Sequence, residues 1–70
     1  MRYAIVVERA VNSYSAYVSD LPGCVATGAT MEETERLIRE AIELHWTGLQ
    51  EDGLPIPQPS SQVEYVEAAV

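Results

Sequence analysis

The stretch from Asp20 to Glu33 constrains the fold most, because it combines a tight turn, a short strand and a helix start. It reads D-L-P-G-C-V-A-T-G-A-T-M-E-E. Proline presets φ at the second position of a turn and glycine supplies the positive φ of the third, so L-P-G-C predicts a type II turn. Thr30 is placed to cap a helix, and Glu33 completes a capping box. We therefore expect strands before this stretch and one helix after it.

Hydrophobic periodicity divides the chain into five elements of a single domain, residues 1–70. Alternating apolar residues indicate strands, and apolar residues at helical spacing indicate one amphipathic helix. Gly53 and Pro55 end that helix, and a proline-rich, polyproline-like connector follows it. The predicted elements are strands at about 2–9, 14–20 and 24–28, a helix at about 31–52 and a strand at about 62–70.

The order β-β-β-α-β predicts a two-layer α+β fold with one helix on one face of a sheet. Short connections make the first three strands an antiparallel meander. The helix then carries the chain across to a last strand parallel to the first, by a right-handed crossover. We therefore expect a mixed four-stranded sheet in the order 3-2-1-4.

The chain is short enough that its core needs outside support. Chains below about 70–80 residues usually need a disulfide, a metal or a partner. Cys24 is the only cysteine and His45 the only histidine, so neither an internal disulfide nor a Cys/His zinc site is expected. Cys24 is interpreted as a small buried hydrophobe, with a reactive thiol as the alternative. Self-association or a protein partner is the expected source of stability.

The absence of an export signal and the negative net charge limit the kinds of partner that this chain can bind. The N-terminal M-R-Y-A-I-V-V-E has no signal-peptide pattern, and no apolar run approaches the ~20 residues of a membrane span. We therefore expect a cytoplasmic protein without membrane contact. The formal net charge is −7, with no lysine and no basic residue after Arg39. Such a surface repels phosphate backbones and suits a basic protein partner. The alternative is that the acidity only aids solubility.

One helix covers only one face of the sheet, whereas the first and last predicted strands are apolar on both faces. If Val6, Ala16 and Val18 pack under the helix, an apolar face with tyrosines stays uncovered, and such a face often marks an interface. A merely solvent-tolerant face is the alternative. Trp46, at the edge of the apolar arc of the helix, lies along the sheet margin or anchors a second subunit. The predicted interface residues are Tyr3, Ile5, Val7, Tyr17, Trp46 and Tyr65.

No residue pattern indicates catalysis. His45 falls in the expected buried arc, where a structural hydrogen bond is favoured over a role as base or ligand, and Gly48 is interpreted as a close approach of helix to sheet. A strand-helix-strand trio such as Glu8, Glu43 and Glu64 could hold two Mg²⁺ ions as in a ribonuclease H-like nuclease, but Glu43 lies on the solvent arc of the helix. We therefore expect no enzymatic activity, no catalytic residues, no cofactor and no metal.

Three blocks of the sequence together resemble the HicB-like antitoxin family over essentially the whole chain. They are the L-P-G-C-x-x-x-G-x-T block at 21–30, the E-A-I-E-L helix segment at 40–44, and L-P-I-P-Q-P-S at 54–60. The resemblance implies a fold like a fragment of ribonuclease H, without its activity. Thr34 departs from the alanine that is usual after the Glu33 position.

The resemblance also implies a homo-oligomer, a dimer or a tetramer, that belongs to a type II toxin–antitoxin module. There the family binds and neutralises a small basic HicA-like toxin that cleaves messenger RNA. Many members continue into a C-terminal DNA-binding domain. This sequence carries no such domain, so no direct nucleic-acid binding is expected of it. The alternatives are a solitary homo-oligomeric regulatory or scaffold module of the same fold, and a relic of a metal-dependent nuclease.

Overall fold

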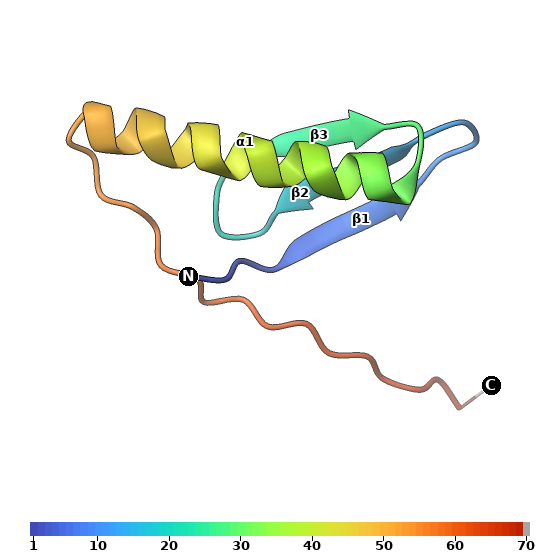
Figure 1. Cartoon of the computed structure of the whole chain (residues 1–70). Coiled ribbons are helices and arrows are strands. Elements are labelled where there is room, and N and C mark those ends of the chain that lie inside the picture. The colour runs from blue at the N-terminus through green and yellow to red at the C-terminus, as the bar shows by residue number, and fades with distance from the viewer. Residues whose placement is uncertain (70) are drawn as a thin grey trace.

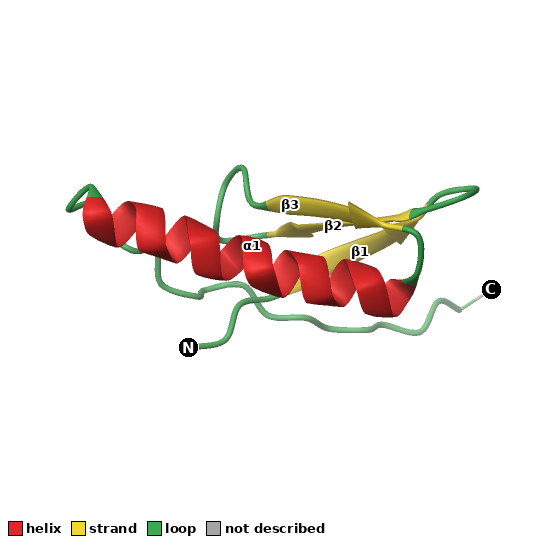
Figure 2. Cartoon of the chain, turned by 45° about the horizontal axis from the view of Figure 1, so that its top comes forward, coloured by secondary structure: helices red, strands yellow, loops and turns green. Residues whose placement is uncertain are grey.

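Three strands followed by one helix make up the regular structure of residues 1–69, the part of the chain that the computed structural model describes (Figure 1). The strands pair antiparallel in the order β1-β2-β3, and the helix packs on one face of this sheet, as a view from another side also shows (Figure 2). The elements are β1 (Ile5–Arg9), β2 (Tyr14–Val18), β3 (Val25–Gly28) and α1 (Met31–Glu51).

The prediction of a mixed four-stranded sheet in the order 3-2-1-4 is wrong. In the described part of the chain the sheet has three strands, all antiparallel, and residues 62–69 pair with none of them. The expected strand at 62–70 also includes Val70, which lies outside the described residues. Alternating apolar residues indicate that a segment can form a strand. They do not indicate whether the segment lies next to a sheet edge with which it can pair.

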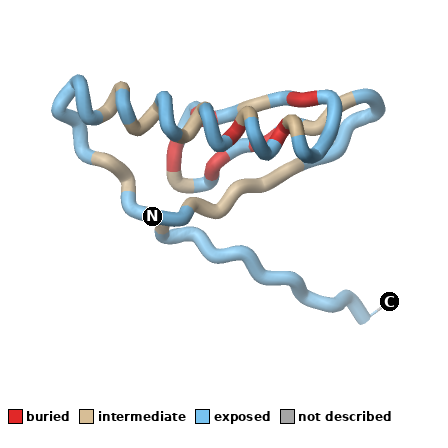
Figure 3. The backbone as a smooth tube through the Cα atoms, in the orientation of Figure 1, coloured by how far each residue is buried: buried red, intermediate tan, exposed pale blue. Residues whose placement is uncertain are grey.

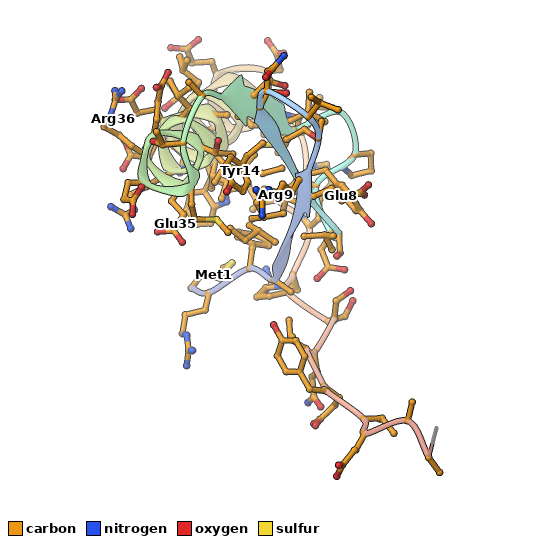
Figure 4. All side chains as sticks on the ribbon, turned by 90° about the vertical axis from the view of Figure 1, so that its right-hand side faces the viewer. Met1, Glu8, Arg9, Tyr14, Glu35 and Arg36 are labelled. Carbon is orange, nitrogen blue, oxygen red and sulfur yellow. The ribbon has the colours of Figure 1, made fainter. Side chains whose placement is uncertain are left out.

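The predicted assignment of β1 to the two faces of the sheet is also wrong. Ile5 lies opposite Val18 and Val7 opposite Ala16, so the odd-numbered residues of β1 share the helix side with the buried residues of β2. Figure 4 agrees, because Glu8 points away from the helix while Arg9 and Tyr14 lie on the helix side. Since β1 is apolar on both faces, its own sequence pattern does not determine which of its alternate residues face the helix. The register of the hairpin with β2 determines it. The hydrogen bond from the Ala10 N–H to the Ser13 carbonyl, 2.8 Å long, closes this hairpin.

The turn and the helix start follow the sequence prediction. Gly23 has φ +82°, and the Cys24 N–H donates to the Leu21 carbonyl at 3.1 Å. The Thr30 hydroxyl accepts from the Glu33 N–H at 3.1 Å, which satisfies one of the free donors of the first helical turn. Residues Asp20 to Glu33 therefore form the predicted turn and the predicted N-cap at Thr30. The described residues do not form the second bond of the predicted capping box, from the Thr30 N–H to the Glu33 carboxylate.

The helix end is also as predicted, but its buried face is rotated. Gly53 has φ +66°, and the Leu54 N–H donates to the Leu49 carbonyl at 2.9 Å, as in a Schellman motif. Leu44 shares the apolar arc of the helix with Ile38 and Ala41 by sequence spacing, yet it is 75% exposed. The core-facing residues in that half of the helix include Ile42 and Trp46.

Helix and sheet approach most closely at Gly28, and the interpretation of Gly48 as a close approach is wrong. A Cβ atom on Gly28 would lie 2.9 Å from the Thr34 backbone nitrogen, whereas one on Gly48 would meet nothing within 4 Å. The Thr34 side chain, buried at this contact, donates to the Thr30 carbonyl at 2.8 Å. The absence of a side chain at Gly28 thus lets α1 begin directly against the sheet.

The core lies between α1 and the adjoining pair β2 and β3, and the buried segments cluster there (Figure 3). No Cα atom of α1 comes within 8 Å of one in β1. Ile5 and Val7 consequently remain half-buried beside the core rather than inside it. The fully buried hydrophobic residues are Ala16, Val18, Leu21, Cys24 and Ile38.

Candidate functional site

The sheet face opposite the helix carries a row of apolar side chains across all three strands. Val6 lies opposite Tyr17, and Tyr17 lies opposite Val25. Directly opposed residues on one face contact each other, so the three form one cross-strand cluster. Tyr17 is 42% and Val25 is 65% exposed. The next row on this face is polar and therefore marks one boundary of the apolar row. It consists of Glu8, Ser15 and Thr27.

A second feature joins three distant parts of the chain through one hydroxyl group. The indole Nε1 of Trp46 donates to the Tyr3 hydroxyl at 3.0 Å, and that hydroxyl donates to the Pro57 carbonyl at 2.6 Å. The N-terminal arm, the second half of α1 and the proline-rich segment after it are thereby tied together. Beside this junction lies a hollow of about 490 Å³, with Ile42 and Trp46 in its wall and Arg39 and Glu43 also lining it. It has room for a side chain of a protein partner.

A third feature fixes the chain as it leaves the proline-rich segment. The Asp20 carboxylate accepts from the backbone N–H groups of Ser60 and Ser61, both at 2.9 Å, and from their two hydroxyls at 3.0–3.1 Å. These bonds stabilise the charged carboxylate. The N–H groups of Ser61 and Ser60, followed by the two hydroxyls, lower the pKa of Asp20 from 3.8 to about 2. We refer to this set of bonds as the Asp20 clamp.

Beyond the Asp20 clamp the chain is exposed. Residues 62–69, which we call the tail, run away from the helix and the sheet (Figures 1 and 3). Tyr65 is 94% and Val66 is 89% exposed, and Val63 is also exposed. The tail is thus an apolar, extended segment that the rest of the described chain leaves uncovered.

The residues predicted as an interface fall into two groups. Tyr3, Ile5, Val7 and Trp46 are partly buried and pack against the core. Tyr17 and Tyr65 are exposed, the first on the open sheet face and the second in the tail. The structure therefore does not bring the six side chains into one patch.

The Asp20 clamp is the feature that the sequence analysis missed. Its partners lie 40 and 41 residues apart along the chain, so no local pattern connects them. The one available signal was the pair Ser60-Ser61 directly after the P-x-P-x-P segment, at a point where a returning chain needs an anchor.

The acidic residues, His45 and Cys24 do not form a metal-binding or catalytic site in the described part of the chain. Within residues 1–69, no group of three or more His, Cys, Asp and Glu side chains lies close enough together to hold a metal ion. His45 is half-buried on α1. Cys24 is buried, and its desolvation raises the pKa of the thiol. In the same part of the chain, no helix is long and apolar enough to cross a membrane.

Comparison with known proteins connects this arrangement to a family. The model of the family described as "HicB_like antitoxin of bacterial toxin-antitoxin system" matches residues 3–69. The chain belongs to the HicB-like antitoxin family. The resemblance drawn from the L-P-G-C, helix and proline-rich blocks is thereby confirmed.

Two curated relatives align with nearly all of this HicB-like chain. An uncharacterized 14.9 kDa protein in the rep-hol intergenic region of Haemophilus phage HP1 is 33% identical over 94% of the chain. A UPF0150 protein of Helicobacter pylori is 40% identical over 91% of it. The chain spans 50% of the length of the phage relative and 90% of the length of the Helicobacter relative.

A solved structure shares the fold of this HicB-like chain. It is described as the HicA3 and HicB3 toxin-antitoxin complex, and it matches with a TM-score of 0.74 and 28% sequence identity. The match covers 86% of the chain and 70% of the matched one. Family and fold thus both point to the toxin–antitoxin class of proteins.

Proposed function

We propose that this chain is the antitoxin of a type II toxin–antitoxin module and neutralises a small basic HicA-like toxin that cleaves messenger RNA. The observation that carries the proposal is the match of 86% of the chain to a structure from a HicA–HicB complex. In this proposal the chain acts by binding rather than by catalysis. It works in the cytoplasm, where the messenger RNA substrate of such a toxin lies.

The charge of the chain supports this choice of partner. A ribonuclease binds phosphate through basic groups, and a protein with a net charge of −7 offers it a competing electrostatic partner. The exposed acids of α1 include Glu32, Glu35, Glu40 and Glu43, so the helix presents carboxylates to an approaching protein. Complementary charge raises the association rate and gives binding a strong dependence on ionic strength.

We further propose that the antitoxin is a homo-oligomer, a dimer or a tetramer. The exposed row at Tyr17 on the open sheet face and the exposed Tyr65 are the predicted interface residues that remain available for such contacts. The other four predicted interface residues pack against the core and so hold the exposed surface in place. They are Tyr3, Ile5, Val7 and Trp46. A solitary oligomeric regulator of the same fold is the second candidate, because an exposed apolar row favours self-association without requiring a toxin.

The decisive experiment measures toxin inhibition directly. The chain is titrated into an RNA cleavage assay that contains the purified basic protein that co-purifies with it from its host. We expect stoichiometric inhibition, and we expect the affinity to fall at least tenfold between 50 and 500 mM salt, on the order of the screening expected for exposed charges. Full RNA cleavage at a large excess of the chain would disprove the proposal. Sedimentation as an oligomer under the same conditions would then favour the solitary regulator.

A further inference from the structure

The tail and strand β1 present complementary, unsatisfied groups. β1 is an edge strand, because β2 is its one neighbour in the described sheet. The Ser19 N–H donates to the Ala4 carbonyl, and in an antiparallel ladder hydrogen-bonded pairs alternate with non-bonded ones. The N–H and C=O groups of Ile5, Val7 and Arg9 therefore face the free edge. Such a row is a template for another strand.

The tail has the properties of the missing strand. Its sequence, Q-V-E-Y-V-E-A-A over residues 62–69, is rich in β-branched and aromatic residues and contains neither glycine nor proline. Eight extended residues span about 26 Å, more than the roughly 17 Å of the five residues of β1. Its apolar side chains are exposed, with Tyr65 at 94%. Length and composition thus suit a strand, and the side chains of Tyr65 and Val66 are almost wholly exposed to solvent.

The Asp20 clamp fixes the start of the tail, and the tail does not pair with the β1 of its own chain. The clamp holds the N–H groups of Ser60 and Ser61, the first donors that a pairing tail would offer. A hollow of about 500 Å³ separates the start of β1 from residues 61–63 and is lined by both. From there the tail continues away from the sheet (Figure 1). The edge of β1 therefore stays open beside a space that an extended segment can enter.

We propose that the tail of one copy pairs with the free edge of β1 in a second copy, and that the exchange is reciprocal. The sheet of each chain keeps its three strands, and the additional strand comes from the other molecule. A second copy is the fitting occupant because every copy carries both a free edge and a free tail, so a twofold exchange satisfies both at once. The charges of the edge and the tail are also complementary. Arg2 and Arg9 flank the free edge of β1, and the charged residues of the tail, Glu64 and Glu67, are acidic.

The exchange would also cover the part of the core that α1 leaves open. Ile5 and Val7 are half-buried, because no Cα atom of α1 comes within 8 Å of one in β1. A strand added along this edge places its apolar side chains next to these two residues. The proposal rests on the self-association proposed above, but not on toxin binding, so the two fail independently.

Hydrogen–deuterium exchange read by NMR on the full-length protein tests the proposal at single amides. We expect protection at alternate amides of the tail and at Ile5, Val7 and Arg9, and we expect this protection to increase with protein concentration. An oligomer built through the open sheet face alone would leave these amides unprotected, because that contact makes no edge hydrogen bonds. Tail amides that exchange at random-coil rates in an oligomeric sample would overturn the exchange, as would a protein that stays monomeric at millimolar concentration.

Proline substitutions in the tail supply the matched variant. The double variant Val66→Pro, Glu67→Pro removes the N–H donors of two consecutive exposed residues, one of which faces β1 in either register, so it blocks pairing while the fold of the monomer stays intact. We expect it to abolish the protection at Ile5, Val7 and Arg9 and to weaken self-association at least tenfold. Gln58→Pro places the same residue in a segment that is already proline-rich, and it should leave both readouts unchanged. Tail amides that become protected only when toxin is added would assign the tail to the toxin and contradict the exchange.

Discussion

The indole N–H of Trp46 donates to the hydroxyl of Tyr3 across 3.0 Å, which ties the second half of α1 to the N-terminal arm. The same hydroxyl donates to the Pro57 carbonyl, so one side chain joins the arm, the helix and the proline-rich segment. Each of the three would otherwise lie loosely on the surface of a domain with a small core. This junction, rather than a fourth strand, therefore holds the N-terminal arm and the proline-rich segment against the body.

Removing either partner of this bond should destabilise the protein. Trp46→Phe keeps an aromatic ring but loses the donor, and we expect the free energy of unfolding to fall by about 1 kcal/mol. Tyr3→Phe breaks both hydrogen bonds and leaves the Trp46 donor unpaired, so its cost should be larger, about 1–3 kcal/mol. Urea denaturation of the two single variants and the double variant measures the coupling. Strictly additive losses would show that the two side chains do not act together.

The Asp20 clamp should weaken only in strong acid. A carboxyl with a lowered pKa contributes stability that is fully present above its ordinary value of 3.8 and is lost as the pH falls through about 2. The amide resonances of Ser60 and Ser61 should therefore stay constant from pH 7 to pH 4 and shift with a midpoint near pH 2. A midpoint near the ordinary value of an aspartate would mean that the bonds to the two serines do not persist in solution.

Substituting Asp20 should release the tail without unfolding the domain. Asp20→Asn keeps the shape of the side chain but removes its charge, and it puts an NH₂ group where Oδ1 accepts the two serine hydroxyls. The remaining neutral oxygen therefore holds the Ser60 and Ser61 N–H groups more weakly than Oδ2 of the carboxylate does. We expect faster amide exchange at Ser60 and Ser61 and an unchanged far-UV circular dichroism spectrum. Glu64→Gln, a change of equal charge in the tail itself, is the control and should leave the exchange at the two serines unaltered.

Two glycines should respond in opposite ways to alanine. A Cβ atom on Gly28 would lie 2.7 Å from the Thr34 hydroxyl and 2.9 Å from its backbone nitrogen, so Gly28→Ala should cost about 1–3 kcal/mol. Gly48→Ala adds its methyl group to open space in the interior of α1 and should stabilise the protein by about 0.5–1 kcal/mol. Thermal unfolding of both variants separates the two outcomes. Equal effects would contradict the close approach of helix and sheet at Gly28.

The open sheet face provides a prediction about self-association. Tyr17→Ser removes the central side chain of the exposed row and should weaken the oligomer by several-fold, because aromatic residues contribute disproportionately to interfaces. Leu44→Ser, on a side chain of α1 that is 75% exposed, removes similar apolar surface away from that row. Analytical ultracentrifugation should show a weaker oligomer for the first variant alone. Identical behaviour of the two would remove Tyr17 from the interface.

The sequence by itself determined the features that depend on neighbouring residues. The turn at Gly23, the cap at Thr30 and the helix end at Gly53 are set by φ preferences and by hydrogen bonds that span a few residues. The family followed from the same blocks, because each combines residues with a specific local conformation. These features need no knowledge of distant contacts.

Only the tertiary structure decided the features that depend on distant parts of the chain. β1 is apolar on both faces, so its side toward the helix was fixed by pairing with β2 rather than by its own pattern. The tail has the composition of a strand but lacks a partner in the described sheet, and the Asp20 clamp, which no local pattern reveals, fixes where it leaves the body. The physical reason is that a strand is completed by hydrogen bonds to another segment, whereas a turn or a helix end is completed by its own neighbours.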